Sequence, residues 1–157
     1  MAQRSPRNTM LHDSPYARMA IAIMSLLGLL DAAYLSLERL TGGQVACPVG
    51  GGCEVVQNSA YALFMGVPVA YIGVAGYAAL LLVALLSLNL ERVAGLALAD
   101  LLLALGVVAL LFGIYLSYLQ VAVIGAICFW CVVAALLDLG ICLAALAHWR
   151  AQRSQPH

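Results

Sequence analysis

The sequence contains no lysine, and charged residues of all kinds make up only 9% of its 157 positions. A soluble domain carries charge on roughly a quarter of its residues, so this composition excludes an ordinary water-soluble protein. The lack of lysine and of any basic patch also excludes the positively charged surface that nucleic-acid binding needs. We therefore expect a membrane protein that binds no nucleic acid.

Histidine is almost as scarce. The three histidines, His12, His148 and His157, lie in or beside the polar ends of the chain. They provide no pair at helical spacing that could hold a haem between two imidazoles. They also form no Ser–His–Asp set of the kind that hydrolases use.

Apolar residues make up 65% of the chain, and they are concentrated in four long runs. A helix that spans a bilayer needs roughly 20 such residues, and the runs cover residues 19–40, 67–90, 93–123 and 127–149. Short connections between them favour antiparallel neighbours. We expect an all-α integral membrane protein, a bundle of four transmembrane helices over residues 17–149, with tails at residues 1–16 and 150–157.

The arginines predict the orientation of this bundle. Only Arg39 lies on one side of the expected membrane, and the other six lie on the opposite side: Arg4, Arg7, Arg18, Arg92, Arg150 and Arg153. By the positive-inside rule, both tails face the cytoplasm, and residues 40–67 and 125–128 face outside. A cleaved signal peptide is the alternative for residues 1–33, but Asp31 would occupy a cleavage-site position that favours small residues. We expect an uncleaved anchor in the plasma or inner membrane.

Four of the five cysteines share the predicted outer side, where disulfides form and persist. Cys47 and Cys53 lie in the first outer segment, and Cys128 and Cys131 open the fourth span. Cys142 lies 11 residues beyond Cys131, which is about 16 Å deeper along a helix. The topology therefore predicts two reactive pairs and one reduced, buried remainder.

The two pairs differ in their surroundings. A thiol in the first turn of a helix lies near unpaired N–H groups, which lowers its pKa and favours the thiolate; we expect this for Cys128. Phe129 and Trp130 make the residues between the Cys128–Cys131 pair apolar, which favours contact with lipid or a hydrophobic ligand. The other pair encloses Pro48 and three glycines, so we expect a mobile loop suited to visiting two partners.

Static cysteines are the main alternative. The first pair could be a structural disulfide, and four thiolates could bind zinc. Structural zinc sites usually use two short C-x₂₋₄-C motifs, whereas Cys47 and Cys53 are separated by five residues. We expect no metal.

The segment after Cys53 predicts a short helix over residues 53–65 that lies along the outer membrane interface. Val56, Ala60 and Phe64 recur on it at helical spacing, and Ser59 could donate a hydrogen bond to a ligand carbonyl. Within the spans, three aspartates are functional candidates because intramembrane acids are costly: Asp31, Asp100 and Asp138. Asp138 could relay protons or form a hydrogen bond across the bundle.

These features occur in an ordered set. Cys47 and Cys53 are followed by Ser59, then by "SAYALFMGVPVAYIG" (residues 59–73), "YLSYLQ" (115–120) and "AICFWC" (126–131). In this set the chain resembles bacterial-type members of the vitamin K epoxide reductase (VKOR) family, over most of its length. The resemblance implies a four-helix bundle around a quinone, capped by the short helix in the outer loop.

The resemblance also implies roles for individual residues. Cys131 would face the quinone, Cys128 would receive electrons from Cys53, and Cys47 would exchange with a thioredoxin-like partner. Ser59 would bind a quinone oxygen, and we add Phe64, Trp130 and Cys131 as expected quinone contacts. Many bacterial relatives carry a fused thioredoxin-like domain; this chain ends at residue 157, which implies a separate exported, DsbA-like partner. Position 135 is alanine, where the animal enzymes have a tyrosine.

The predicted function is therefore that of a membrane thiol oxidoreductase that makes disulfides de novo. Electrons would pass from the partner through Cys47/Cys53 and Cys128/Cys131 to ubiquinone, menaquinone or a phylloquinone-like quinone. Three alternatives remain: a DsbB-type oxidase, in which the order of the two pairs is reversed; a non-enzymatic metal-binding or structural protein; and electron flow in the outward direction, which depends on reduction potentials.

Overall fold

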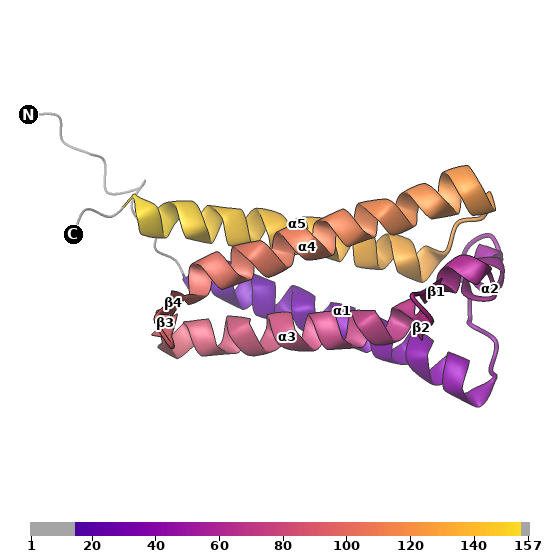
Figure 1. The fold of residues 1–157 in the computed structure, drawn as a ribbon, viewed down its shortest axis with the longest axis horizontal. Helices are drawn as coiled ribbons and strands as arrows, with labels where there is room; N and C mark the ends of the chain where they lie inside the picture. Colours follow the sequence, from indigo (N-terminus) through magenta and orange to yellow (C-terminus); the bar gives the residue numbers. More distant parts are fainter. Residues whose placement is uncertain (1–14, 155–157) are drawn as a thin grey trace, which may run out of the picture.

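The computed structural model describes residues 15–154 and consists mainly of four long helices (Figure 1). These are α1 (Pro15–Thr41), α3 (Val69–Asn89), α4 (Leu98–Tyr118) and α5 (Phe129–Arg153). Within the described residues, four helices are long and apolar enough to cross a membrane, the third of them counted to Ile124. The predicted all-α bundle is confirmed, and the chain has the architecture of a multi-pass membrane protein.

The ends of the helices differ slightly from the predicted spans. Helix α1 already begins at Pro15, and α5 continues to Arg153, so both helices extend into the segments that we assigned to tails. The remainder of those tails, residues 1–14 and 155–157, lies outside the described residues.

The bundle core is formed where α1 packs against α3 and α5, and α4 against α5. Ile21, Leu102 and Ile141 are completely buried in it. The ring of Tyr77 from α3 packs so closely on Gly28 of α1 that an added Cβ would overlap it, so a larger residue there would displace this ring.

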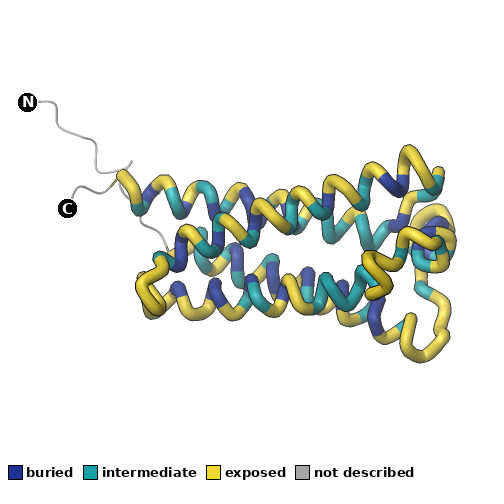
Figure 2. The backbone as a smooth tube through the Cα atoms, viewed as in Figure 1, coloured by how far each residue is buried: buried dark blue, intermediate teal, exposed yellow. Residues whose placement is uncertain are grey.

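Exposed positions cover the outer faces of the helices (Figure 2). Many of them are large and apolar, including Leu26, Leu82, Leu111 and Leu136 on the four long helices. A soluble protein rarely exposes apolar surface so continuously, whereas lipid accepts it without cost.

The segment between α1 and α3 contains α2 (Gly52–Gln57), a 3₁₀ turn (Ala60–Ala62) and a hairpin of β1 (Leu63–Phe64) with β2 (Val67–Pro68). The predicted helix over residues 53–65 is therefore wrong in its second half. Met65 and Gly66 have φ values of 51° and 85°, which is the two-residue turn that matches the twist of a hairpin. That α2 lies in the membrane interface stays a prediction.

A second hairpin, β3 (Arg92–Val93) with β4 (Leu96–Ala97), lies at the opposite end of the bundle and leads into α4 (Figure 1). The predicted third span over residues 93–123 includes this hairpin at its start. At its end the helix widens into a π-helical segment, η2 (Leu119–Ile124). Gly125, with φ of 70°, then turns the chain toward α5.

Candidate functional site

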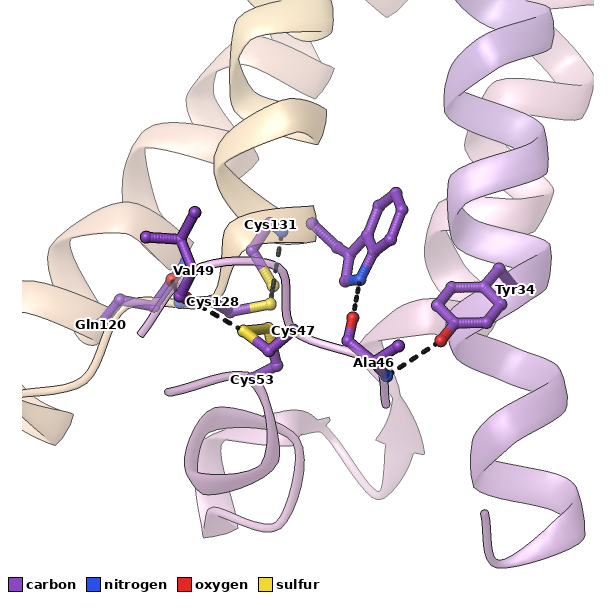
Figure 3. Close-up of a disulfide and its surroundings, with 9 residues drawn as sticks. Tyr34, Ala46, Cys47, Val49, Cys53, Gln120, Cys128 and Cys131 are labelled. Carbon is purple, nitrogen blue, oxygen red and sulfur yellow. Dashed lines mark hydrogen bonds between the residues drawn. A yellow bond between two sulfur atoms is a disulfide. The ribbon is translucent and has the colours of Figure 1, made fainter. Parts of the chain in front are cut away.

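The four cysteines of the two predicted pairs lie together at one end of the bundle (Figure 3). Cys47 and Cys53 form a disulfide, and Cys128 and Cys131 are free thiols. Cys53 and Cys128 have no exposed surface and belong to one buried cluster with Val56. The sulfur atoms that would have to exchange between the pairs are therefore neighbours inside the protein.

A close approach of two backbones brings α2 to this place. A Cβ added at Gly52, the first residue of α2, would collide with the carbonyl group of Ile127. Only glycine allows this contact. Because Cys53 follows Gly52 and Cys128 follows Ile127, the contact also holds the two cysteines near each other. The last glycine of the "GGG" run thus lets α2 dock against the segment before α5, a role beyond the loop mobility that the sequence predicts.

The second pair lies at the start of α5. Cys128 is the residue that caps the helix, and its Sγ accepts hydrogen bonds from the Cys131 thiol (2.7 Å) and from the Cys131 backbone N–H (3.3 Å). The bond from the Cys131 thiol lowers the pKa of Cys128 below the usual thiol value, although burial acts in the opposite direction. Cys128 is thus the thiol of the pair prepared to become a thiolate.

Gln120 holds the backbone at this point, a role that was not predicted from the sequence. Its Oε1 accepts from the Cys128 N–H at 2.9 Å, and its backbone carbonyl accepts from the Ala126 N–H at 3.1 Å. The side chain is only 4% exposed. The sequence feature that could have indicated this role is a glutamine near the end of an apolar run, because the amide of a buried glutamine needs hydrogen-bond partners.

The loop that carries Cys47 is held on both sides of the preceding residue, Ala46. Trp130 Nε1 donates to the Ala46 carbonyl at 2.7 Å, and the Ala46 N–H donates to the Tyr34 hydroxyl at 3.0 Å. The rings of Tyr34 and Trp130 lie 5.3 Å apart. We call these three residues the Ala46 clamp, part of which is seen in Figure 3.

A cavity of about 380 Å³ extends from this site into the bundle, with walls from all four long helices, α2 and β1. Three of the residues predicted to contact a quinone line it: Ser59, Phe64 and Cys131. The fourth, Trp130, lines a smaller pocket beside Tyr34. The walls are mainly apolar. The polar side chains among them are Asp31, Gln57, Ser59, Tyr61, Tyr77, Gln120 and Asp138.

The predicted contacts differ in how free they are to bind a ligand. Ser59 Oγ donates to the Val56 carbonyl at 2.7 Å, so its hydrogen is used within the protein and its oxygen can accept. Phe64 packs edge-on against Phe112, with 5.5 Å between the ring centres. The hairpin turn that the sequence analysis missed is what brings Phe64 to the cavity.

The three aspartates of the spans have different surroundings. Tyr77 donates from its hydroxyl to Asp138 Oδ1 at 2.8 Å, so the expected hydrogen bond across the bundle exists. Asp100 is exposed and accepts from Trp149 Nε1 at 2.7 Å. Asp31 is buried, and its Oδ1 has no hydrogen-bond partner within residues 15–154.

Residues 19–146 match the model of the vitamin K epoxide reductase family. The chain belongs to this family. All four cysteines of the site and nearly the whole VKOR-like bundle fall inside the matched range. Cys142, the fifth, is a buried free thiol on α5, where it packs against Gly106 of α4.

A named relative is the thiol-disulfide oxidoreductase LTO1 of Arabidopsis thaliana, which is 48% identical over 50 residues. The match covers 31% of this chain and 13% of the plant protein. The similarity therefore concerns a short segment of a much longer relative.

Proposed function

We propose that this VKOR-family chain is a quinone-coupled thiol oxidoreductase that generates disulfides. The observation that carries the proposal is the buried contact cluster of Cys53 and Cys128, which joins a disulfide in the loop to a dithiol in the wall of an apolar cavity. The name of the plant relative, a thiol-disulfide oxidoreductase, supports the same reaction class.

The proposed cycle uses exchange through mixed disulfides. A thiolate of the exported thioredoxin-like partner attacks Cys47, which breaks the Cys47–Cys53 bond, releases Cys53 and joins the partner to Cys47 in a mixed disulfide. The partner's second thiolate then attacks the partner sulfur of that mixed disulfide, which frees Cys47 and leaves the partner oxidised. Cys53 attacks Cys128 of an oxidised Cys128–Cys131 pair and releases Cys131. Cys47 then attacks Cys53 in the mixed disulfide, so the first disulfide re-forms and Cys128 is released. The result is the arrangement found in the structure, with one disulfide and two thiols.

The cavity fits a quinone in its chemistry. Its walls are mainly apolar with a few polar groups, as small-molecule sites usually are, and Cys131 is one of them. A bound quinone supplies a two-electron acceptor. Ser59 and Phe64 are the residues that we assign to hold it. A quinone oxygen only accepts hydrogen bonds, so Ser59 would donate its hydroxyl hydrogen to that oxygen in place of the Val56 carbonyl.

The proposal places the two cysteine pairs on the extracytoplasmic side of the cell membrane and both termini in the cytoplasm. The distribution of the arginines supports this orientation. The thioredoxin-like partner then acts outside the cytoplasm, and the cycle sends electrons inward to the quinone.

The test uses purified, fully reduced protein in detergent, mixed with ubiquinone or menaquinone without oxygen. Maleimide labelling counts the remaining thiols in the native chain and in Cys131→Ala. We expect rapid loss of thiols in the native chain and not in the variant. Thiols that survive both quinones would refute the proposal, and zinc in the purified protein would then favour static, metal-binding cysteines.

A further inference from the structure

The cavity contains a titratable side chain that the cysteine chemistry does not use. Asp31 of α1 is 8% exposed, and its Oδ1 has no hydrogen-bond partner among residues 15–154. It lines the large cavity and also the smaller pocket beside Tyr34. A buried, unpaired carboxyl oxygen is costly in apolar surroundings, so its position in this wall indicates a role toward a molecule that enters the cavity.

The other two aspartates of the spans have protein partners that account for them. Asp138 accepts a hydrogen bond from Tyr77 at 2.8 Å, and Asp100 accepts one from Trp149 at 2.7 Å. Asp100 also lies 3.8 Å from Arg153 at the exposed end of the bundle. Of the three, Asp31 alone has, within residues 15–154, a fully buried carboxyl oxygen without a hydrogen-bond partner in the cavity wall.

The proposed reaction requires a proton carrier in this wall. When Cys128 and Cys131 form a disulfide, two S–H bonds break, and two electrons and two protons leave the pair. Reduction of a quinone to a quinol takes up two electrons and two protons, so the reaction balances without another reactant. The protons nevertheless have to move from sulfur to oxygen inside a cavity with mainly apolar walls.

We propose that Asp31 is a catalytic residue that holds a proton at its carboxyl group, donates it to an oxygen of the acceptor, and regains one of the two protons released by the thiols. This inference rests on the proposed function. The titratable side chains that share the cavity wall with Asp31 are Tyr61, Tyr77, Cys131 and Asp138. Asp138 carries the one carboxyl group among these four, and it already accepts a hydrogen bond from Tyr77.

The experiment compares Asp31→Asn with Asp100→Asn, which removes a carboxylate of equal size far from the cavity. Quenching of tryptophan fluorescence measures quinone binding, and maleimide labelling without oxygen measures thiol loss. Infrared difference spectra between reduced and oxidised protein report protonated carboxyl groups directly. We expect Asp31→Asn to bind quinone as the control does. Its thiols are expected to be oxidised about 100-fold more slowly, which is a typical effect of losing a general acid. Its infrared spectrum is expected to lack a carboxyl band that the control retains.

The outcomes separate this inference from the proposed function. If native protein keeps its thiols in the presence of quinone, the proposed function fails. If native protein reacts and Asp31→Asn reacts equally fast, or loses quinone binding, only the role of Asp31 as a proton carrier is overturned. If Asp31→Asn does not fold, the infrared spectra are recorded on Asp138→Asn, which keeps Asp31 but removes the other carboxyl group of the cavity wall. A carboxyl band that changes on oxidation supports the inference there, and the absence of such a band overturns it.

Discussion

The Ala46 clamp predicts that Trp130→Phe slows exchange between the two cysteine pairs without affecting the step at the cavity. Phenylalanine keeps an aromatic ring beside Tyr34 but cannot donate to the Ala46 carbonyl, which the indole N–H reaches at 2.7 Å. One such hydrogen bond contributes about 1 kcal/mol. Its loss shifts the docking equilibrium of the Cys47 loop by about fivefold toward the open form.

Two measurements check this magnitude. Amide hydrogen exchange at Ala46, whose N–H donates to Tyr34, is expected to become about fivefold faster as the loop opens more often. The rate at which quinone oxidises all four thiols is expected to fall by up to the same factor. Tyr34→Phe is the matched variant on the other side of the clamp, because it removes the acceptor of the Ala46 N–H.

The control is the same substitution in a chain that carries Cys47→Ala and Cys53→Ala. Only the Cys128–Cys131 pair can react there, so Trp130→Phe is expected to leave its oxidation rate unchanged. If the substitution slows this reduced chain as much as the full one, the reasoning is refuted. Trp130 would then act at the quinone, as the sequence analysis predicted.

Three further predictions concern the site and its surroundings. Gly52→Ala is expected to lower the free energy of unfolding by about 1–3 kcal/mol through overpacking against the Ile127 carbonyl, as measured by thermal unfolding. The folded variant is also expected to exchange more slowly between the two cysteine pairs, and full activity would contradict the docking role of Gly52. Cys142→Ala is expected to keep its activity, and a folded but inactive variant would show that this thiol takes part. The Cys131 thiol lowers the pKa of Cys128, so the Cys128 thiolate is expected to persist to lower pH in the native chain than in Cys131→Ala, as followed by ultraviolet titration. Identical titration curves would show that the Cys131 thiol does not lower this pKa.

The sequence predicted the bundle well because length and hydropathy determine it. Four apolar runs became four helices, with ends that differ by a few residues. The failures lie where one residue changes the backbone. Met65 adopts a positive φ beside Gly66, so a helical pattern ends in a hairpin. The π-helical segment η2 before Gly125 likewise leaves no mark in the hydropathy of the chain.

The site was predictable in its cysteines and much less in their supports. Spacing and topology grouped Cys47 with Cys53, and Cys128 with Cys131, but left open which disulfide is formed at rest; the structure brings the four together with a Cys47–Cys53 disulfide. The bond from Trp130 to Ala46 joins residues 84 positions apart, and the bond from Tyr77 to Asp138 joins residues 61 positions apart. Such contacts depend on the packing of helices, which hydropathy alone does not describe.

The burial of the cysteines has a consequence for kinetic selectivity. Cys47 and Cys131, at the two ends of the proposed route, are partly exposed, whereas Cys53 and Cys128 between them have no exposed surface. Small soluble thiols can therefore collide with the loop sulfur but not with the inner two. A reductant that reaches only Cys47 can pass its electrons further only through the protein's own exchange steps, so these steps set an upper limit on the leakage of electrons from glutathione-like molecules.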